Sequence, residues 1–162
     1  MSKIKKVVYD IETLNSCFTY TDLDIDTKEI KQFVIHPRRN ELNAFLDYYE
    51  TVDLGVGFNN QGFDYPVIHF MFNKRKEWNE ELKLGIIGVE NIIHAIHNEA
   101  ERIINLQNNP TGFFQTVAIK EEDSKVFQLD LFKVWHYNNK AKSTGLKGLE
   151  VSMNLDNVME MT

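Results

Sequence analysis

The chain has 162 residues, of which 43% are hydrophobic and 12% aromatic, a composition that suits one folded domain and is not that of a disordered chain. Its formal net charge of −6 is not typical of a general nucleic-acid binder, and its single cysteine excludes an intrachain disulfide. The length has room for one domain, which we expect over residues 1–162. No apolar run approaches the length of a membrane span or has the pattern of a signal peptide, so we expect the protein in the cytoplasm.

The N-terminal part of the chain has the pattern of several short strands. Segments rich in β-branched and aromatic residues predict an antiparallel meander over residues 5–11, 18–23 and 29–35. A helix is expected to begin near Asn40, because apolar residues recur at three- and four-residue spacing from Leu42 to Tyr49. The short apolar run at residues 54–58 is typical of a buried parallel strand, and we expect it beside the first strand.

Longer helices are expected in the middle of the chain. One starts near Pro66, since proline suits the first turn of a helix, and it is expected to end near Lys74-Arg75-Lys76. The remaining expected elements are a helix at 88–107, strands at 113–119 and 125–131, and a short helix at 143–150. This order predicts an α/β fold: a mixed sheet with antiparallel first strands and parallel later strands, with helices on both faces.

Two carboxylates lie close together in the first predicted strand. Asp10 and Glu12 are separated by one residue, so their side chains point to the same face of the strand. Two carboxylates on one face repel each other unless a cation or a proton lies between them, and Mg²⁺ and Mn²⁺ prefer such oxygen ligands. The alternative is an exposed edge strand with two solvated acids.

A third acid is expected near this pair. If the strand at 54–58 lies beside the first strand, Asp64 at the start of the following helix comes close to Asp10 and Glu12. Sites of open α/β sheets gather beyond the carboxyl ends of the strands, where all three acids would lie. The alternative role for Asp64 is helix capping, which its position in the first turn also favours.

Two motifs of the chain resemble those of the DEDD 3′→5′ exonucleases, the ribonuclease H-like proofreading domains of DNA polymerases. Tyr9-Asp10-Ile11-Glu12-Thr13 resembles their first motif. Residues 56–68 resemble the second, in which an asparagine, three further residues, an aromatic residue and an aspartate follow one another, here from Asn59 to Asp64. Segments 128–132 and 145–150 are similar to the later strand and the Leu-rich helix of phage-type members, so the resemblance spans nearly the whole chain.

The resemblance implies a ribonuclease H-like fold and two-metal hydrolysis of the 3′ terminal phosphodiester bond of single-stranded DNA. It implies that Asp10, Glu12 and Asp64 are catalytic and bind two Mg²⁺ or Mn²⁺ ions. The residues that it places at the substrate are Thr13, Leu14, Asn59 and Phe63. The implied partners are the 3′ end of single-stranded DNA and the polymerase portion of the same or a separate chain, without a membrane, in the host cytoplasm if the chain is phage-encoded.

The chain departs from the family at the third motif, Tyr-x-x-x-Asp or His-x-x-x-Asp, whose aspartate is the fourth carboxylate. From Gln128 onward, neither Asp130 nor Asp156 has a tyrosine or histidine four residues before it. We therefore expect a domain that lacks its C-terminal helix and is weakly active or inactive as an isolated chain, through truncation, a split gene or a natural short form. Asp130 matches a recurrent aspartate of the family outside the four carboxylates, and a structural role is favoured for it.

Two other functions stay open at this point. The first is a catalytically inactive nuclease-like module that binds nucleic acid or a polymerase partner. The second is a fragment of an RNA-processing exonuclease.

Overall fold

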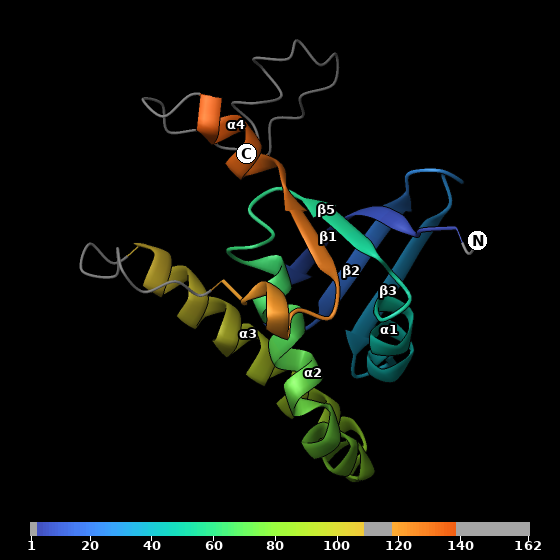
Figure 1. Cartoon of the computed structure of the whole chain (residues 1–162). Helices are drawn as coiled ribbons and strands as arrows, with labels where there is room; N and C mark the ends of the chain where they lie inside the picture. Colours follow the sequence, from blue (N-terminus) through green and yellow to red (C-terminus); the bar gives the residue numbers. More distant parts are fainter. Residues whose placement is uncertain (1–2, 109–117, 139–162) are drawn as a thin grey trace, which may run out of the picture.

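A computed structural model describes residues 3–108 and 118–138, which contain a six-stranded sheet and the helices around it (Figure 1). The strands are β1 (Lys6–Thr13), β2 (Phe18–Asp24), β3 (Ile30–His36), β4 (Arg39–Asn40), β5 (Leu54–Gly57) and β6 (Phe127–Asp130). The α-helices are α1 (Leu42–Tyr49), α2 (Asp64–Glu81), α3 (Ile86–Asn108) and α4 (Leu131–Asn138). Two short 3₁₀ turns, η1 (Leu82–Leu84) and η3 (Glu121–Asp123), precede α3 and β6.

The sheet is mixed, with the strand order β4-β3-β2-β1-β5-β6. Strands β1 to β4 form an antiparallel meander, whereas β5 runs parallel to β1 on its other side and β6 runs parallel to β5. The predicted α/β class and the mixed sheet are thus confirmed. The predicted strand at 113–119 falls mostly outside the described residues and the predicted helix at 143–150 falls wholly outside them, whereas α4 was not predicted.

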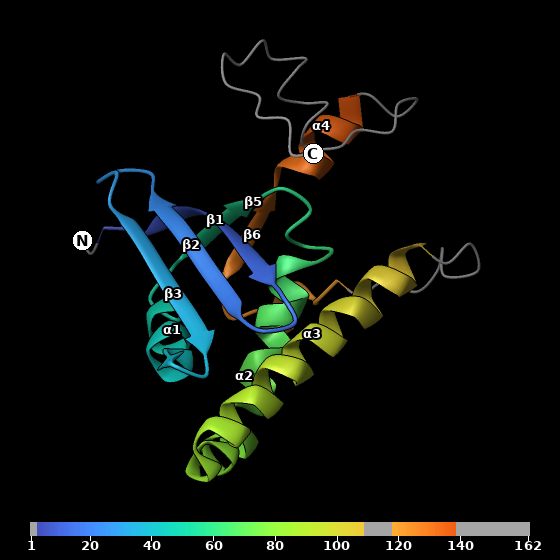
Figure 2. The same cartoon turned by 180° about the vertical axis from the view of Figure 1, so that it is seen from behind.

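One face of the sheet builds the core. Along β1 buried and more exposed residues alternate, and Tyr9 and Ile11 point to the buried side. There Tyr9 meets Tyr20 and Tyr49, and Tyr20 lies 4.6 Å from Phe45, measured between ring centroids. Helices α1, α2 and α3 contribute their apolar sides to the same cluster. Figure 2 shows this arrangement from behind.

The opposite face is open at one row of neighbouring residues. Ile30, Leu23, Val8, Val56 and Leu129 are in register across five strands. All but Val56 are 37–68% exposed, and Val56 is buried apart from the main core. Within residues 3–108 and 118–138, helices α1, α2 and α3 thus pack on one face of the sheet, and the expectation of helices on both faces stays a prediction, because the helix expected at 143–150 lies outside these residues. Helices α2 and α3 share a face because they belong to a single crossover from β5 to β6, and such a crossover places its helices on one side.

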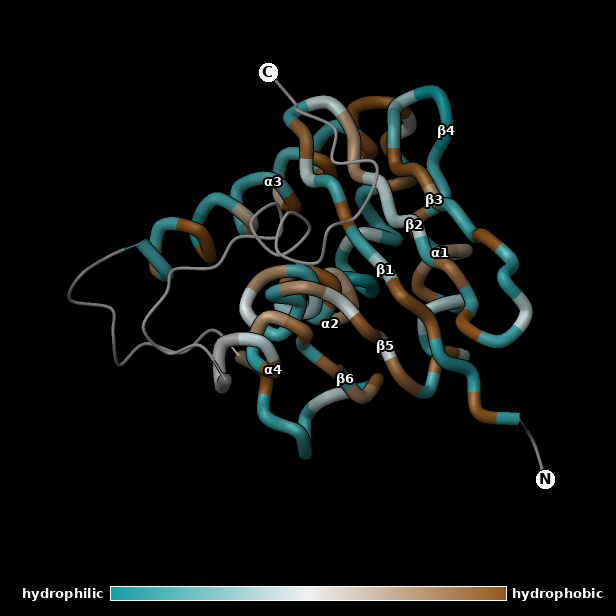
Figure 3. Tube along the Cα trace, turned by 90° about the horizontal axis from the view of Figure 1, so that it is seen from above, coloured by the Kyte–Doolittle hydropathy of each residue, from teal (hydrophilic) through white to brown (hydrophobic). Residues whose placement is uncertain are grey.

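Helices α2 and α3 form a close hairpin. A Cβ atom on Gly88 would lie 1.9 Å from the carbonyl oxygen of Glu81, so only glycine fits where the two helices meet. Hydrophobic and hydrophilic segments alternate along α3, as expected of a helix with one apolar side (Figure 3). In the part of the chain that the structure describes, neither these nor the other helices are long and apolar enough to cross a membrane.

The predicted end of the first long helix was wrong. Helix α2 continues through Lys74-Arg75-Lys76 to Glu81. Arg75 does not complement a helix end but joins α2 to α1, because its guanidinium donates to the side chains of Asn43 and Asp47.

Candidate metal centre between β1 and β5

The candidate site lies where β1 and β5 separate. The two strands pair in parallel only up to Val8 and Val56. Beyond this point the backbone N–H of Ile11 donates to Oδ1 of Asp64, over 3.2 Å, instead of to a strand neighbour. Strands β2, β3 and β4 lie on one side of β1, and the later strands β5 and β6 lie on its other side. The site is therefore at a topological switch point, the position where open α/β sheets most often bind ligands.

Asp10 and Asp64 form an interacting pair of carboxyl groups. Asp64 is 5% exposed at the start of α2, and its pKa is raised to about 7, first by burial and then by the charge of Asp10. The N–H of Ile11 acts in the opposite direction. The pKa of Asp10 is raised as well, by desolvation, although a hydrogen bond with Asp64 and one with the backbone of Ile11 oppose the rise. The pair is thus arranged to share a proton or a cation.

Glu12 lies on the same face of β1 as Asp10, as predicted, and both residues are exposed, in contrast to the buried Asp64. Among residues 3–108 and 118–138 no three or more His, Cys, Asp or Glu side chains come together in a group that could hold a metal ion. The structure thus unites two of the three predicted acids, and places the third two residues along the same strand face. Two carboxylates fit a hard divalent cation, because Mg²⁺ commonly takes one or two carboxylates and completes its shell with water.

The loop between β5 and α2 sets the position of Asp64. Asn59 adopts a φ of +57°, in the left-handed region that asparagine tolerates. Its carbonyl oxygen accepts the N–H groups of Gly62 and Phe63, and the carbonyl of Asn60 accepts that of Tyr65. These bonds turn the chain directly into α2, so that Asp64 enters the first helical turn facing β1. Asp64 therefore lies in the first turn of α2, as the capping alternative requires, but its carboxylate also accepts a hydrogen bond from the backbone of β1, which capping alone does not explain.

Strand β6 holds this loop from its other side. The carboxylate of Asp130 accepts the backbone N–H groups of Asn59, Gln61 and Phe132, at 2.8, 3.2 and 3.0 Å. Gln128, two residues earlier, accepts at Oε1 from Tyr9 and from Asn60. The structural role favoured for Asp130 agrees with these contacts.

Comparisons with protein-family models, with curated proteins and with solved structures found no match.

The predicted substrate residues surround the carboxylate pair with different exposure. Leu14 follows β1 and is 52% exposed, whereas Phe63 packs partly against the core. The side chain of Asn59 lies over Gly62, where an added Cβ would come within 2.5 Å of Asn59 Oδ1. The carbonyl of Thr13 is occupied by His97 of α3, whose Nδ1 lies 3.0 Å away. His94 and His97 are three residues apart, a spacing close to that of metal ligands, but solvated positions on a helix are the favoured prediction for them. The contact of His97 with Thr13 joins residues 84 apart, so no local pattern indicates it.

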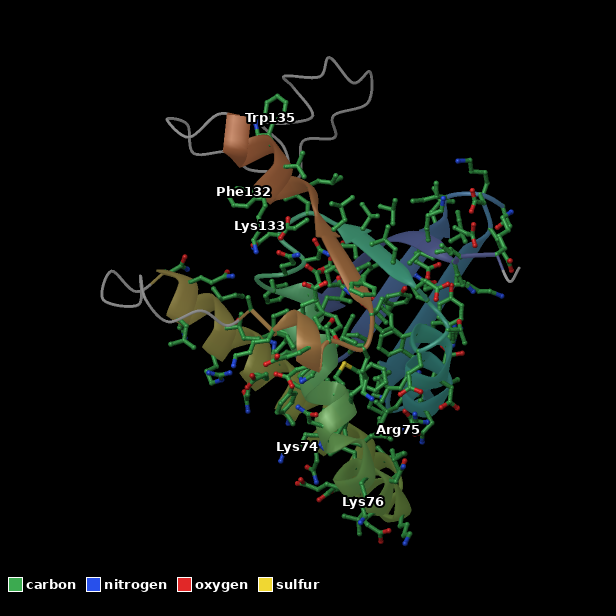
Figure 4. All side chains as sticks on the ribbon, viewed as in Figure 1. Lys74, Arg75, Lys76, Phe132, Lys133 and Trp135 are labelled. Carbon is green, nitrogen blue, oxygen red and sulfur yellow. The ribbon has the colours of Figure 1, made fainter. Side chains whose placement is uncertain are left out.

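The basic cluster of α2 lies away from the site. Lys74, Arg75 and Lys76 come ten or more residues after Asp64, roughly 15 Å along the helix at 1.5 Å per residue. Figure 4 shows them on the lower half of α2, whereas Lys133 lies near the end of β6. The Lys133 ammonium group contacts Oε1 of Gln61 in the loop before Asp64. Lys133 is therefore the basic residue of these four that borders the site.

Proposed function

We propose that the chain carries the metal centre of a proofreading-type 3′→5′ exonuclease domain with a ribonuclease H-like fold. The substrate would be the 3′ end of single-stranded DNA, and the reaction two-metal hydrolysis of its terminal phosphodiester bond. The observation that carries the proposal is the bond from the N–H of Ile11 to Asp64, because it brings the acid of the second motif to the strand that holds Asp10 and Glu12.

The topology supports the same proposal. The antiparallel strands β1 to β3 followed by the parallel strands β5 and β6 agree with the mixed sheet implied by the resemblance. Asp10 and Glu12 lie toward the carboxyl end of β1, and Asp64 follows the carboxyl end of β5. The two motifs come in the order that the resemblance implies, with strands and a helix between them.

In this proposal the residues of the site have three roles: binding the metal ions, orienting the attacking water and contacting the substrate. Asp10 and Asp64 hold the divalent ions, and Glu12, on the same face of β1, joins them and orients the attacking water. Bound ions would lower the pKa of that water and stabilise charge on the leaving oxygen. Asn59 and Phe63 border the substrate strand, and the exposed Leu14 contacts its terminal base by apolar contact, which tolerates any sequence.

The test is manganese binding by titration calorimetry on the metal-free chain at pH 8. We expect the wild-type chain to release heat on binding Mn²⁺, and Asp10→Ala to lose that heat. Asp26→Asn is a matched control, because Asp26 is an exposed acid in the turn between β2 and β3, and it should bind as the wild type does. Equal binding by all three chains would contradict the proposed centre, and absence of binding in the wild type would favour a non-catalytic nuclease-like module.

A second measurement separates DNA from RNA substrates. The 3′ ends of single-stranded DNA and RNA of the same sequence would compete for the Mn²⁺-loaded chain. Preference for DNA is expected for a proofreading-type domain. Preference for RNA would instead favour the RNA-processing exonuclease.

A further inference from the structure

The end of strand β6 meets the loop before Asp64 through a single buried carboxylate. Asp130 is the last residue of β6 and is 3% exposed. Its Oδ1 accepts the N–H groups of Asn59 and Phe132, and its Oδ2 accepts that of Gln61. Three backbone donors thus supply the hydrogen bonds that a buried carboxylate needs.

A short covalent and hydrogen-bonded path leads from this carboxylate to the candidate site. The N–H of Asn59 binds Asp130, and the carbonyl of Asn59 accepts the N–H of Phe63 over 3.0 Å. Phe63 is the N-cap residue of α2, and the next residue is Asp64, whose Oδ1 takes the N–H of Ile11. A movement of the loop at Asn59 would therefore displace Asp64 relative to β1.

The N-cap itself gives α2 no such anchor. Phe63 makes no side-chain hydrogen bond to the helix, so the start of α2 depends on backbone bonds within the loop. Asn59 is in the left-handed region, a conformation that neighbouring bonds must hold. Two of the donors on Asp130, the N–H groups of Asn59 and Gln61, belong to this loop.

We propose that Asp130 is a positioning residue for the candidate metal centre: it fixes the loop from Asn59 to Gln61 so that the Asp64 carboxylate is held beside Asp10. The proposal rests on the proposed function in so far as it concerns metal. The oxygens of Asp130 already accept three backbone N–H groups, so the proposal gives Asp130 the role of holding the loop and not that of a ligand.

The test compares Asp130→Ala and Asp130→Asn with Leu129→Ala. The alanine variant removes all three acceptor bonds, whereas the asparagine variant keeps one acceptor oxygen. Leu129 is the preceding residue, is 41% exposed and points to the open face, so its substitution leaves the loop bonds in place.

The first readout is amide hydrogen exchange of Ile11 in the metal-free chain, measured by NMR against the amide of Phe45 in α1. A positioning role predicts exchange of Ile11 on the order of tenfold faster in Asp130→Ala, less in Asp130→Asn, and unchanged relative to Phe45 in Leu129→Ala. A purely structural role would speed both amides equally, which would overturn the proposal. If the alanine variant does not fold, the asparagine variant decides by the same ratio.

The second readout is Mn²⁺ affinity by calorimetry under conditions where every variant is folded. Loss of a residue that orients a metal ligand without binding the metal typically weakens metal binding 10–100-fold. We expect a loss of about this size for Asp130→Ala. Unchanged affinity in the folded variant would count against positioning. If the wild type itself binds no Mn²⁺, the proposed centre fails, while the exchange ratio of Ile11 to Phe45 still decides the role of Asp130.

Discussion

Two buried carboxyl groups accept hydrogen bonds from different kinds of partner. Asp22 accepts hydrogen bonds from the hydroxyl groups of Tyr20 and Tyr48, both 2.7 Å away. Asp64 has only backbone donors, the N–H of Ile11 and its own N–H, and a second acid, Asp10, as its neighbour. Burial raises the pKa of both Asp22 and Asp64, but only Asp64 also meets a like charge. A buried carboxyl group beside a second acid lowers the stability of the fold, and groups with pKa values shifted in this way are common at functional sites.

Asp64 should make the stability of the metal-free chain fall as the pH rises. Its pKa is about 7 in the folded chain and near its ordinary value of 3.8 when unfolded, so the folded state keeps a proton that the unfolded state loses. The stabilisation is fully present below about pH 4 and is lost as the pH passes through 7. In Asp64→Asn, which retains an acceptor for the N–H of Ile11, we expect the fall to shrink by about 2–4 kcal/mol.

Urea unfolding at pH 5 and pH 8 in the presence of a chelator measures this effect. The pKa of Asp22 is raised too, so Asp22→Asn serves as the comparison, and the Asp64 variant should show the larger change. Parallel pH curves for the wild type and Asp64→Asn would contradict the assignment.

At the scale of elements, the sequence predicted what depends on local pattern. The alternation around Tyr9 and Ile11 located β1 and its faces, and the spacing of apolar residues located α1 and α3. Contacts made through tertiary structure could not be read in this way. Helix α2 continues past its predicted end to Glu81, and Arg75 within it binds Asp47 of α1, a contact that local pattern does not indicate. The bonds from Gln128 and Asp130 to the loop were likewise hidden, since nothing in the local sequence identifies a partner about 70 residues away.

The α2–α3 hairpin offers a prediction at this scale. Gly88→Ala would place a Cβ 1.9 Å from the backbone oxygen of Glu81, and backbone atoms cannot move aside as a flexible side chain can. We expect a loss of about 3 kcal/mol in the free energy of unfolding, at the upper end of typical overpacking costs. His94→Ala, an exposed position on the same helix, should change it by less than about 0.5 kcal/mol. Urea denaturation of both variants checks this, and equal midpoints would show that the hairpin can relax.

At the scale of the whole molecule, the negative net charge affects how the chain would bind a nucleic acid at the candidate site. A chain with a net charge of −6 gains little from general attraction to nucleic acid, so affinity for a DNA end would depend on divalent ions at the acidic site.

The isolated chain should be a poor nuclease even with metal. The sequence from Gln128 onward has no Tyr-x-x-x-Asp or His-x-x-x-Asp motif, so one ligand and the residue that helps activate water are missing from the proposed mechanism. One well-placed stabilising group contributes roughly 3–4 kcal/mol, or 10²–10³ in rate. With 3′-labelled single-stranded DNA and Mn²⁺, we expect turnover at least about a hundredfold below the 1–10³ s⁻¹ of typical enzymes. A full rate from this polypeptide would refute the expectation.

The switch point at β1 also bears on the order of folding. The meander from β1 to β3 closes through short turns, whereas the bond between Ile11 and Asp64 joins residues 53 apart, and that between Gln61 and Asp130 joins residues 69 apart. Long loops cost more entropy to close and form late in folding. We therefore expect the carboxylate pair to be assembled after the meander, so that repulsion between the two ionised acids opposes a late step of folding.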